Sequence, residues 1–212
     1  PSVPRHQFLA EREKAYDPDG KTGLIELDIS DVLETPYPAT IPAILARYVK
    51  VRAGDSLFHS FNASGEVFYV LQGTGSSINA GDTVTWGKGD VFCFPGGNET
   101  VHEAIDSAIL FCVTNEPLLA FENLRAPSQG KSRNETVHWP HDEIEKHLEE
   151  IYERPKTSET SGVSIQFSTP ATAPSRNTIP MINTAINTLE SGGDQRPHRH
   201  NGAAITLAIE GE

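Results

Sequence analysis

The amino-acid sequence predicts an all-β protein, folded as a closed antiparallel barrel or sandwich, with a helical connector. Short runs rich in β-branched and aromatic residues recur between about residues 43 and 116. Turn sequences such as NAGD, GKGD and PGGN separate these runs. Several short strands at such spacing are typical of barrels and sandwiches.

Four regions are expected along the chain. Residues 1–40 form a polar, proline-containing N-terminal arm with a short helix at FLAEREKAY, and residues 41–120 form the first β domain. Residues 121–179 form a connector that contains a helix over 141–153. A second block of strands, which is incomplete in this chain, begins at 180 and runs to 212.

The connector helix is predicted from its start signals and its periodicity. Pro140 suits the first position of a helix, and Asp142 and Glu143 suit the positive end of the helix dipole. Apolar residues follow on one face at helical spacing, at Ile144, Leu148 and Ile151.

Composition excludes several classes of partner. The formal net charge is -12 and the isoelectric point about 5.1, which argues against nucleic acid and anionic membrane surfaces as partners. The sequence has no apolar run of about 18 residues, and its first residues lack the apolar core of a signal peptide. We therefore expect a cytoplasmic protein in which Cys93 and Cys112, both in apolar runs, are buried free thiols.

A first group of candidate ligands lies in GDSLFHSFNASGEVFYVLQG and GDVFCFPGGNETVH. Alternate residues of a strand face one side, so His59 and residue 61 should both point into the barrel. Glu66 on the next strand and His102 on a later one are expected to converge with them. A barrel of this size holds one metal ion and one small ligand.

These two segments resemble the two motifs of the cupin family, which implies a double-stranded β-helix, or jelly roll. The family's first motif has H-x-H, and its second histidine is replaced here by Phe61. Two readings stay open: His59, Glu66 and His102 form a facial triad for Fe(II), or this domain holds no metal.

A second group of candidate ligands lies in GGDQRPHRHNGAAITLAIEGE. His198 and His200 form an intact H-x-H, while Ala204 stands where the first motif has its carboxylate. The block resembles the opening of the first block, as a turn, a histidine-bearing strand and an apolar strand that ends in a glycine turn. This repetition indicates a duplicated domain. A solvated basic turn is the alternative reading of the two histidines.

Together the blocks resemble gentisate 1,2-dioxygenase and its relatives that cleave salicylate. The first block adds WGKGDVFCFP, His102 and AILFCVTNEPLLAFENL to this resemblance. It implies a bicupin and an Fe(II)-dependent, extradiol-type ring-cleaving dioxygenase that acts with O₂ on a small, gentisate-like aromatic acid. His198 and His200 would hold Fe(II), or another divalent transition metal, and Arg196 would pair with the substrate carboxylate. The resemblance also implies a homo-oligomer.

A cupin needs strands and a third ligand after this second motif, so we expect the natural chain to continue beyond residue 212. Two other function classes remain open at this point. One is a cupin lyase, decarboxylase or isomerase that acts on a small acid. The other is a non-catalytic bicupin that binds a small ligand, since one fold supports many chemistries.

Overall fold

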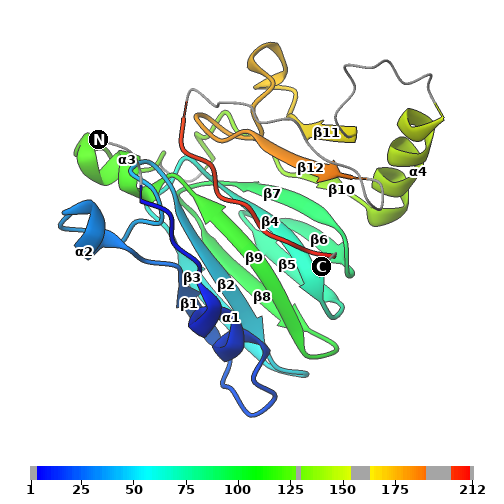
Figure 1. Cartoon of the computed structure of the whole chain (residues 1–212), viewed down its shortest axis with the longest axis horizontal. Coiled ribbons are helices and arrows are strands. Elements are labelled where there is room, and N and C mark those ends of the chain that lie inside the picture. The colour runs from blue at the N-terminus through cyan, green and yellow to red at the C-terminus, as the bar shows by residue number, and fades with distance from the viewer. Residues whose placement is uncertain (1–3, 128–129, 154–162, 190–201, 211–212) are drawn as a thin grey trace.

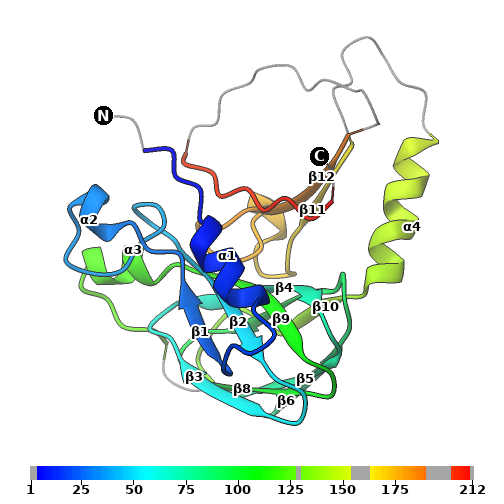
Figure 2. The same cartoon turned by 60° about the horizontal axis from the view of Figure 1, so that its bottom comes forward.

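The computed structural model describes residues 4–127, 130–153, 163–189 and 202–210. Within these residues, two antiparallel sheets face each other as a barrel (Figures 1 and 2). The larger sheet has the order β1-β2-β9-β4-β7-β10 and the smaller one β3-β8-β5-β6. The strands of the larger sheet are β1 Gly23–Glu26, β2 Leu45–Val51, β9 Ala108–Thr114, β4 Gly65–Gln72, β7 Val91–Pro95 and β10 Val137–Trp139. The strands of the smaller sheet are β3 Ser56–Ser60, β8 Glu99–Ala104, β5 Gly75–Asn79 and β6 Asp82–Trp86.

The barrel interior is a single apolar cluster that both sheets supply. Alternation along each strand decides which side chains enter it. On β3, His59 is buried while its neighbours Phe58 and Ser60 are exposed. The largest members from the facing sheet are aromatic and aliphatic side chains of β4, β7 and β9: Phe68, Phe92, Phe94 and Leu110.

The turn between β5 and β6 shows why the sequence folds as a hairpin here. Asn79 pairs with Asp82, so the loop has two residues, Ala80 and Gly81. Both have positive φ angles, 52° and 94°, as the twist of a two-residue hairpin requires. Glycine adopts this conformation without strain, which explains the NAGD signal in the sequence.

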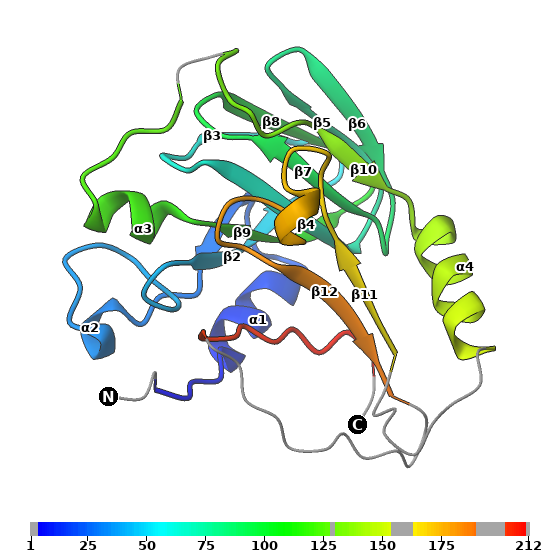
Figure 3. The ribbon, with the colours of Figure 1, turned by 90° about the horizontal axis from the view of Figure 1, so that it is seen from above.

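Helices and a separate hairpin lie around the barrel (Figure 3). The helices are α1 Leu9–Tyr16, α2 Ser30–Leu33, α3 Glu116–Phe121, α4 His141–Tyr152 and the short 3-10 helix η1 Ala173–Ser175. β11 Val163–Phe167 and β12 Thr184–Thr188 pair as an antiparallel two-stranded sheet. No helix among the described residues is long and apolar enough to cross a membrane.

Helix α4 fills the place expected for the connector helix, with one difference at its start. Pro140 is the N-cap with an extended ψ of 146°, so the helix begins at His141 rather than at the proline. Its apolar face packs Ile144 and Leu148 against Val91 of the barrel and Phe167 of β11. This cluster fixes the hairpin to the outside of the larger sheet.

The outer face of the larger sheet is also apolar. Tyr48, Ile109 and Phe111 lie buried there, and Ile205 and Leu207 from the C-terminal segment pack against them. Both cysteines are buried free thiols, as expected.

One turn occurs twice in the chain. Residues 40–44 read T-I-P-A-I and residues 178–182 read T-I-P-M-I. In each copy the threonine N–H donates to the carbonyl of the last isoleucine, at 3.0 Å in the first and 2.8 Å in the second. In each, the two isoleucines form an isolated antiparallel bridge.

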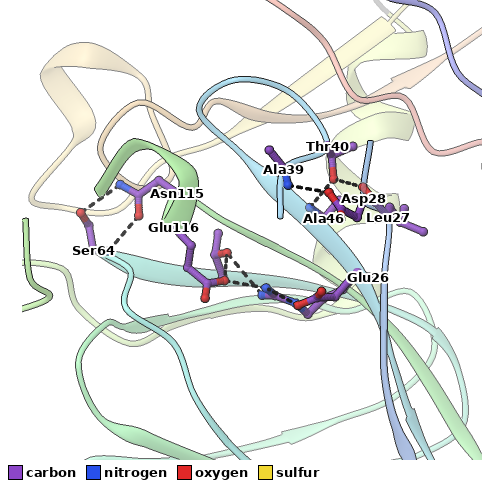
Figure 4. Close-up of polar contacts among 11 residues, drawn as sticks. Glu26, Leu27, Asp28, Ala39, Thr40, Ala46, Ser64, Asn115 and Glu116 are labelled. Carbon is purple, nitrogen blue, oxygen red and sulfur yellow. Dashed lines mark hydrogen bonds and ion pairs between the residues drawn. The ribbon is translucent and has the colours of Figure 1, made fainter. Parts of the chain in front are cut away.

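In both copies the threonine hydroxyl bonds two equivalent backbone groups, one carbonyl before the turn and one N–H after it. Thr40 Oγ1 donates to the Leu27 carbonyl at 2.5 Å and accepts from the Ala46 N–H at 2.8 Å (Figure 4). Thr178 Oγ1 donates to the Phe167 carbonyl at 2.8 Å and accepts from the N–H of Thr184 at 3.2 Å. The turn therefore joins β11 to β12 as it joins the β1 edge to β2.

Candidate functional site in the first barrel

The interior of the barrel brings two of the predicted site residues into direct contact. His59 comes from β3 and His102 from the neighbouring strand β8, and both side chains are buried. Their Nε2 atoms lie 2.9 Å apart. One of the two nitrogens therefore carries the proton that the other accepts.

The far side of His102 is held by a second pair of side chains. Its Nδ1 lies 2.6 Å from the Ser77 hydroxyl, and the Trp86 indole Nε1 donates to the same oxygen at 2.7 Å. Ser77 is fully buried and Trp86 nearly so. The imidazole of His102 is thereby fixed in orientation, in the way that an outer partner fixes a metal-ligating histidine.

Glu66 is buried on β4, as the sequence predicted, but it bonds elsewhere. Its Oε2 accepts a hydrogen bond from the Thr100 hydroxyl at 2.8 Å, and Thr100 in turn accepts from Asn79 Nδ2, also at 2.8 Å. Glu66 Oε1 is buried and has no hydrogen-bond partner among the described residues.

Phe61 occupies the position of the second histidine in H-x-H. Its ring stacks on that of His59 at a centroid distance of 4.1 Å and an interplanar angle of 21°. The guanidinium carbon of Arg47, on β2, lies 3.9 Å from the centroid of the same ring. Phe61 is thus packed between an imidazole and a cation, a contact that aromatic faces favour.

Arg47 is almost fully buried, and ion pairs compensate its charge. Nη2 lies 2.6 Å from Oε2 of Glu116 and 3.7 Å from Oε1 of Glu26, both labelled in Figure 4. Nη1 donates to the Thr114 hydroxyl at 3.3 Å. The sequence analysis did not select Arg47 as a site residue. Its position could have indicated a buried charge, because it lies on the inward face of the apolar run ILARYVKV.

Burial sets the protonation of the site. Desolvation, with a smaller contribution from Arg47, lowers the pKa of His59 to about 3, and desolvation together with His59 holds the pKa of His102 well below 6.5. Desolvation raises the pKa of Glu66 to about 8 against the weaker effect of the Thr100 hydrogen bond. At neutral pH both imidazoles are therefore neutral, and Glu66 is a protonated acid.

These residues do not fit a three-ligand iron site. Two imidazole nitrogens converge, Phe61 offers no ligand, and Glu66 accepts a hydrogen bond from Thr100 rather than from either histidine. Across residues 4–127, 130–153, 163–189 and 202–210, His, Cys, Asp and Glu side chains form no group of three or more that could hold a metal ion.

The second group of predicted site residues, Arg196, His198 and His200, lies outside the described residues. The sequence analysis also missed Thr100 and Ser77. Their contacts run between strands that are far apart in the sequence, so no local spacing indicates them.

Comparison with known proteins gives a match in sequence to a curated protein and matches in fold to solved structures. The chain is 34% identical over 83 residues to the 5-aminosalicylate 1,2-dioxygenase of Comamonas sp, which covers 38% of this chain and 22% of that protein. No family model matches the chain. The chain thus spans about a fifth of the length of this curated relative.

Solved structures of salicylate 1,2-dioxygenase from Pseudoaminobacter salicylatoxidans share the fold. A single-residue variant of that enzyme aligns with a TM-score of 0.58 and 15% identity, over 84% of this chain and 60% of that one. A structure with gentisate aligns over 55% of this chain and 30% of that one, at 23% identity and a TM-score of 0.41. The chain is therefore a cupin-fold protein that resembles the salicylate 1,2-dioxygenases in fold and a 5-aminosalicylate 1,2-dioxygenase in sequence.

Proposed function

We propose that this chain is part of a ring-cleaving dioxygenase that acts with O₂ on a hydroxylated aromatic carboxylate of the gentisate and salicylate type. The observation that carries this proposal is the 34% identity over 83 residues to a 5-aminosalicylate 1,2-dioxygenase. The fold shared with salicylate 1,2-dioxygenase supports it.

We place the iron in a second barrel, with His198 and His200 as ligands. The repeated turn supports this placement. In the first copy the turn at 40–44 leads into β2 and then to His59, and the turn at 178–182 leads into β12 and then to His198. With one residue more between the turn and the H-x-H pair in the second copy, His198 and His200 correspond to His59 and Phe61. A third protein ligand is left unassigned.

Fe(II) in such a site would supply open positions for a chelating substrate and for O₂, and a path for electrons between them. Arg196 is proposed to pair with the substrate carboxylate, because a guanidinium binds a carboxylate through two parallel hydrogen bonds. Arg199 should point away from the two histidines, since alternate residues of a strand face opposite sides.

The function is tested by O₂ consumption of the full-length protein, purified without oxygen and loaded with Fe(II). We expect uptake on adding gentisate, salicylate or 5-aminosalicylate, and its loss in His198→Ala and His200→Ala. Arg199→Ala is the matched control between the two histidines and should keep the activity. Arg196→Ala should raise KM more than it lowers kcat.

Absence of O₂ uptake on all three acids by iron-loaded protein would overturn the dioxygenase proposal. Turnover of a small acid without O₂ would favour a cupin lyase, decarboxylase or isomerase. Binding without turnover would favour a non-catalytic bicupin.

A further inference from the structure

We propose that the first barrel binds no transition metal because Phe61, held in place by Arg47, occupies its third ligand position, leaving a latent site that lacks one ligand. This inference concerns the first barrel alone. It holds whether or not the second barrel carries iron.

The first support is the position of Phe61. It follows His59 by two residues, and both side chains enter the barrel, which is where a second imidazole of an H-x-H pair would point. The ring is only 7% exposed and stacks directly on His59. An apolar ring therefore fills the space that a third nitrogen ligand would need.

The second support is the charge beside that ring. Arg47 is 1% exposed, and its guanidinium is fixed over Phe61 by Glu116 and Thr114. This contact, together with the stacking on His59, holds the Phe61 ring between the two side chains and keeps the third ligand position filled.

The third support is that the two imidazoles already have protein partners on the sides that meet. His59 and His102 bond each other through Nε2 at 2.9 Å, and Ser77 holds Nδ1 of His102. A metal ion would have to break the hydrogen bond between the imidazoles. The two nitrogen atoms that face each other are thus already paired within the protein.

The same geometry makes the site recoverable. Two Nε2 atoms 2.9 Å apart are close to the separation of two neighbouring ligands on one ion with metal–nitrogen distances of about 2.1 Å. Phe61→Ala would remove the ring without adding a ligand, whereas Phe61→His adds the third nitrogen beside His59. The structure therefore predicts a gain of metal binding from Phe61→His alone.

The test counts Co²⁺ bound per chain in the full-length protein after removal of free metal, by elemental analysis. The wild-type count is taken as the baseline, whatever the second barrel contributes. Phe61→His should add about one Co²⁺ per chain, and adding His102→Gln to this variant should remove it. The matched control is Phe58→His on the outer face of the same strand, where the side chain is 61% exposed, and it should leave the count unchanged.

Two results would overturn the proposal. The first is a count that falls by one in His59→Gln or His102→Gln of the otherwise wild-type protein, since this would show a metal already held by the first barrel. This result decides the question even if Phe61→His fails to fold. The second is a folded Phe61→His protein, checked by near-ultraviolet circular dichroism, that gains no more Co²⁺ than Phe58→His.

The count is independent of catalysis. Failure of the dioxygenase proposal would not change the gain of one Co²⁺ that is expected over the wild-type baseline. Conversely, an active enzyme whose iron depends on His59 would overturn this inference and leave the dioxygenase proposal standing.

Discussion

The buried polar side chains of the barrel differ in which protonation state the fold favours. Desolvation keeps His59 and His102 neutral in the folded state. Below the ordinary histidine pKa of 6.5 the unfolded chain takes up protons at these residues and the folded state does not, so acid destabilises the folded state. Glu66 is held protonated, so base destabilises the folded state. From these three groups, stability should be greatest near the pKa of an unfolded histidine.

The alkaline side gives the clearer prediction. Folded Glu66 has a pKa of about 8 against 4.5 for an ordinary glutamate, so between these values the folded state holds a proton that the unfolded state has lost. Stability is therefore lost as the pH rises through this window. Glu66→Gln keeps an uncharged acceptor for Thr100 and should abolish the loss, measured as the free energy of unfolding in urea at about pH 6.5 and about pH 8.5. Equal losses in the variant and the wild type would contradict this account of Glu66.

A second residue-scale prediction concerns the shared hydroxyl behind His102. Ser77→Ala leaves the Trp86 N–H and Nδ1 of His102 buried without a partner, and each unpaired group costs about 1–3 kcal/mol. We expect a loss of about 2 kcal/mol or more in the free energy of unfolding. Ser60→Ala, at an exposed position on β3, is the control and should change stability by less than about 0.5 kcal/mol.

At the scale of elements, the repeated turn links the two segments that lie before and after it through its threonine hydroxyl. Thr40 bonds both the Leu27 carbonyl and the Ala46 N–H, and Thr178 does the same for Phe167 and Thr184. In each copy, one buried hydroxyl is at once the donor to a backbone carbonyl and the acceptor from a backbone N–H. The repetition of this hydrogen-bonding pattern in both turns is the structural argument for a duplicated domain.

This turn predicts the effect of a near-isosteric change. Thr40→Val keeps the shape but leaves both backbone groups unpaired. Each unpaired group costs about 1–3 kcal/mol, so the protein should lose about 2 kcal/mol or more of unfolding free energy in urea denaturation. Thr83→Val, on the exposed face of β6, removes a hydroxyl without this consequence and serves as the control. Equal effects of the two substitutions would show that the Thr40 hydroxyl does not hold the turn.

At the scale of the whole molecule, the barrel was predictable because turn residues and period-two alternation are local signals. They placed His59, Phe61, Glu66 and His102 inside, where the structure has them. They did not predict that Glu66 would bond Thr100 and leave the histidine pair, because this contact crosses from one sheet to the other. The same limit hid the partners of Arg47, because Glu116 and Phe61 lie at distant points of the chain.

At this scale the central claim is that the second barrel binds the iron and the first barrel does not. The interior of the first barrel is filled by its own side chains, among them the His59–His102 pair, and the second barrel is proposed to carry the iron. The domain boundaries at residues 41–120 and 180–212 and a homo-oligomeric state remain predictions.

The most direct measurement is iron per chain in the full-length protein, purified without oxygen, for the wild type, His198→Ala and His59→Ala. The account predicts about one iron per chain in the wild type, its loss in His198→Ala and its retention in His59→Ala. Iron that survives His198→Ala and disappears in His59→Ala would contradict the account, because it would place the metal in the first barrel.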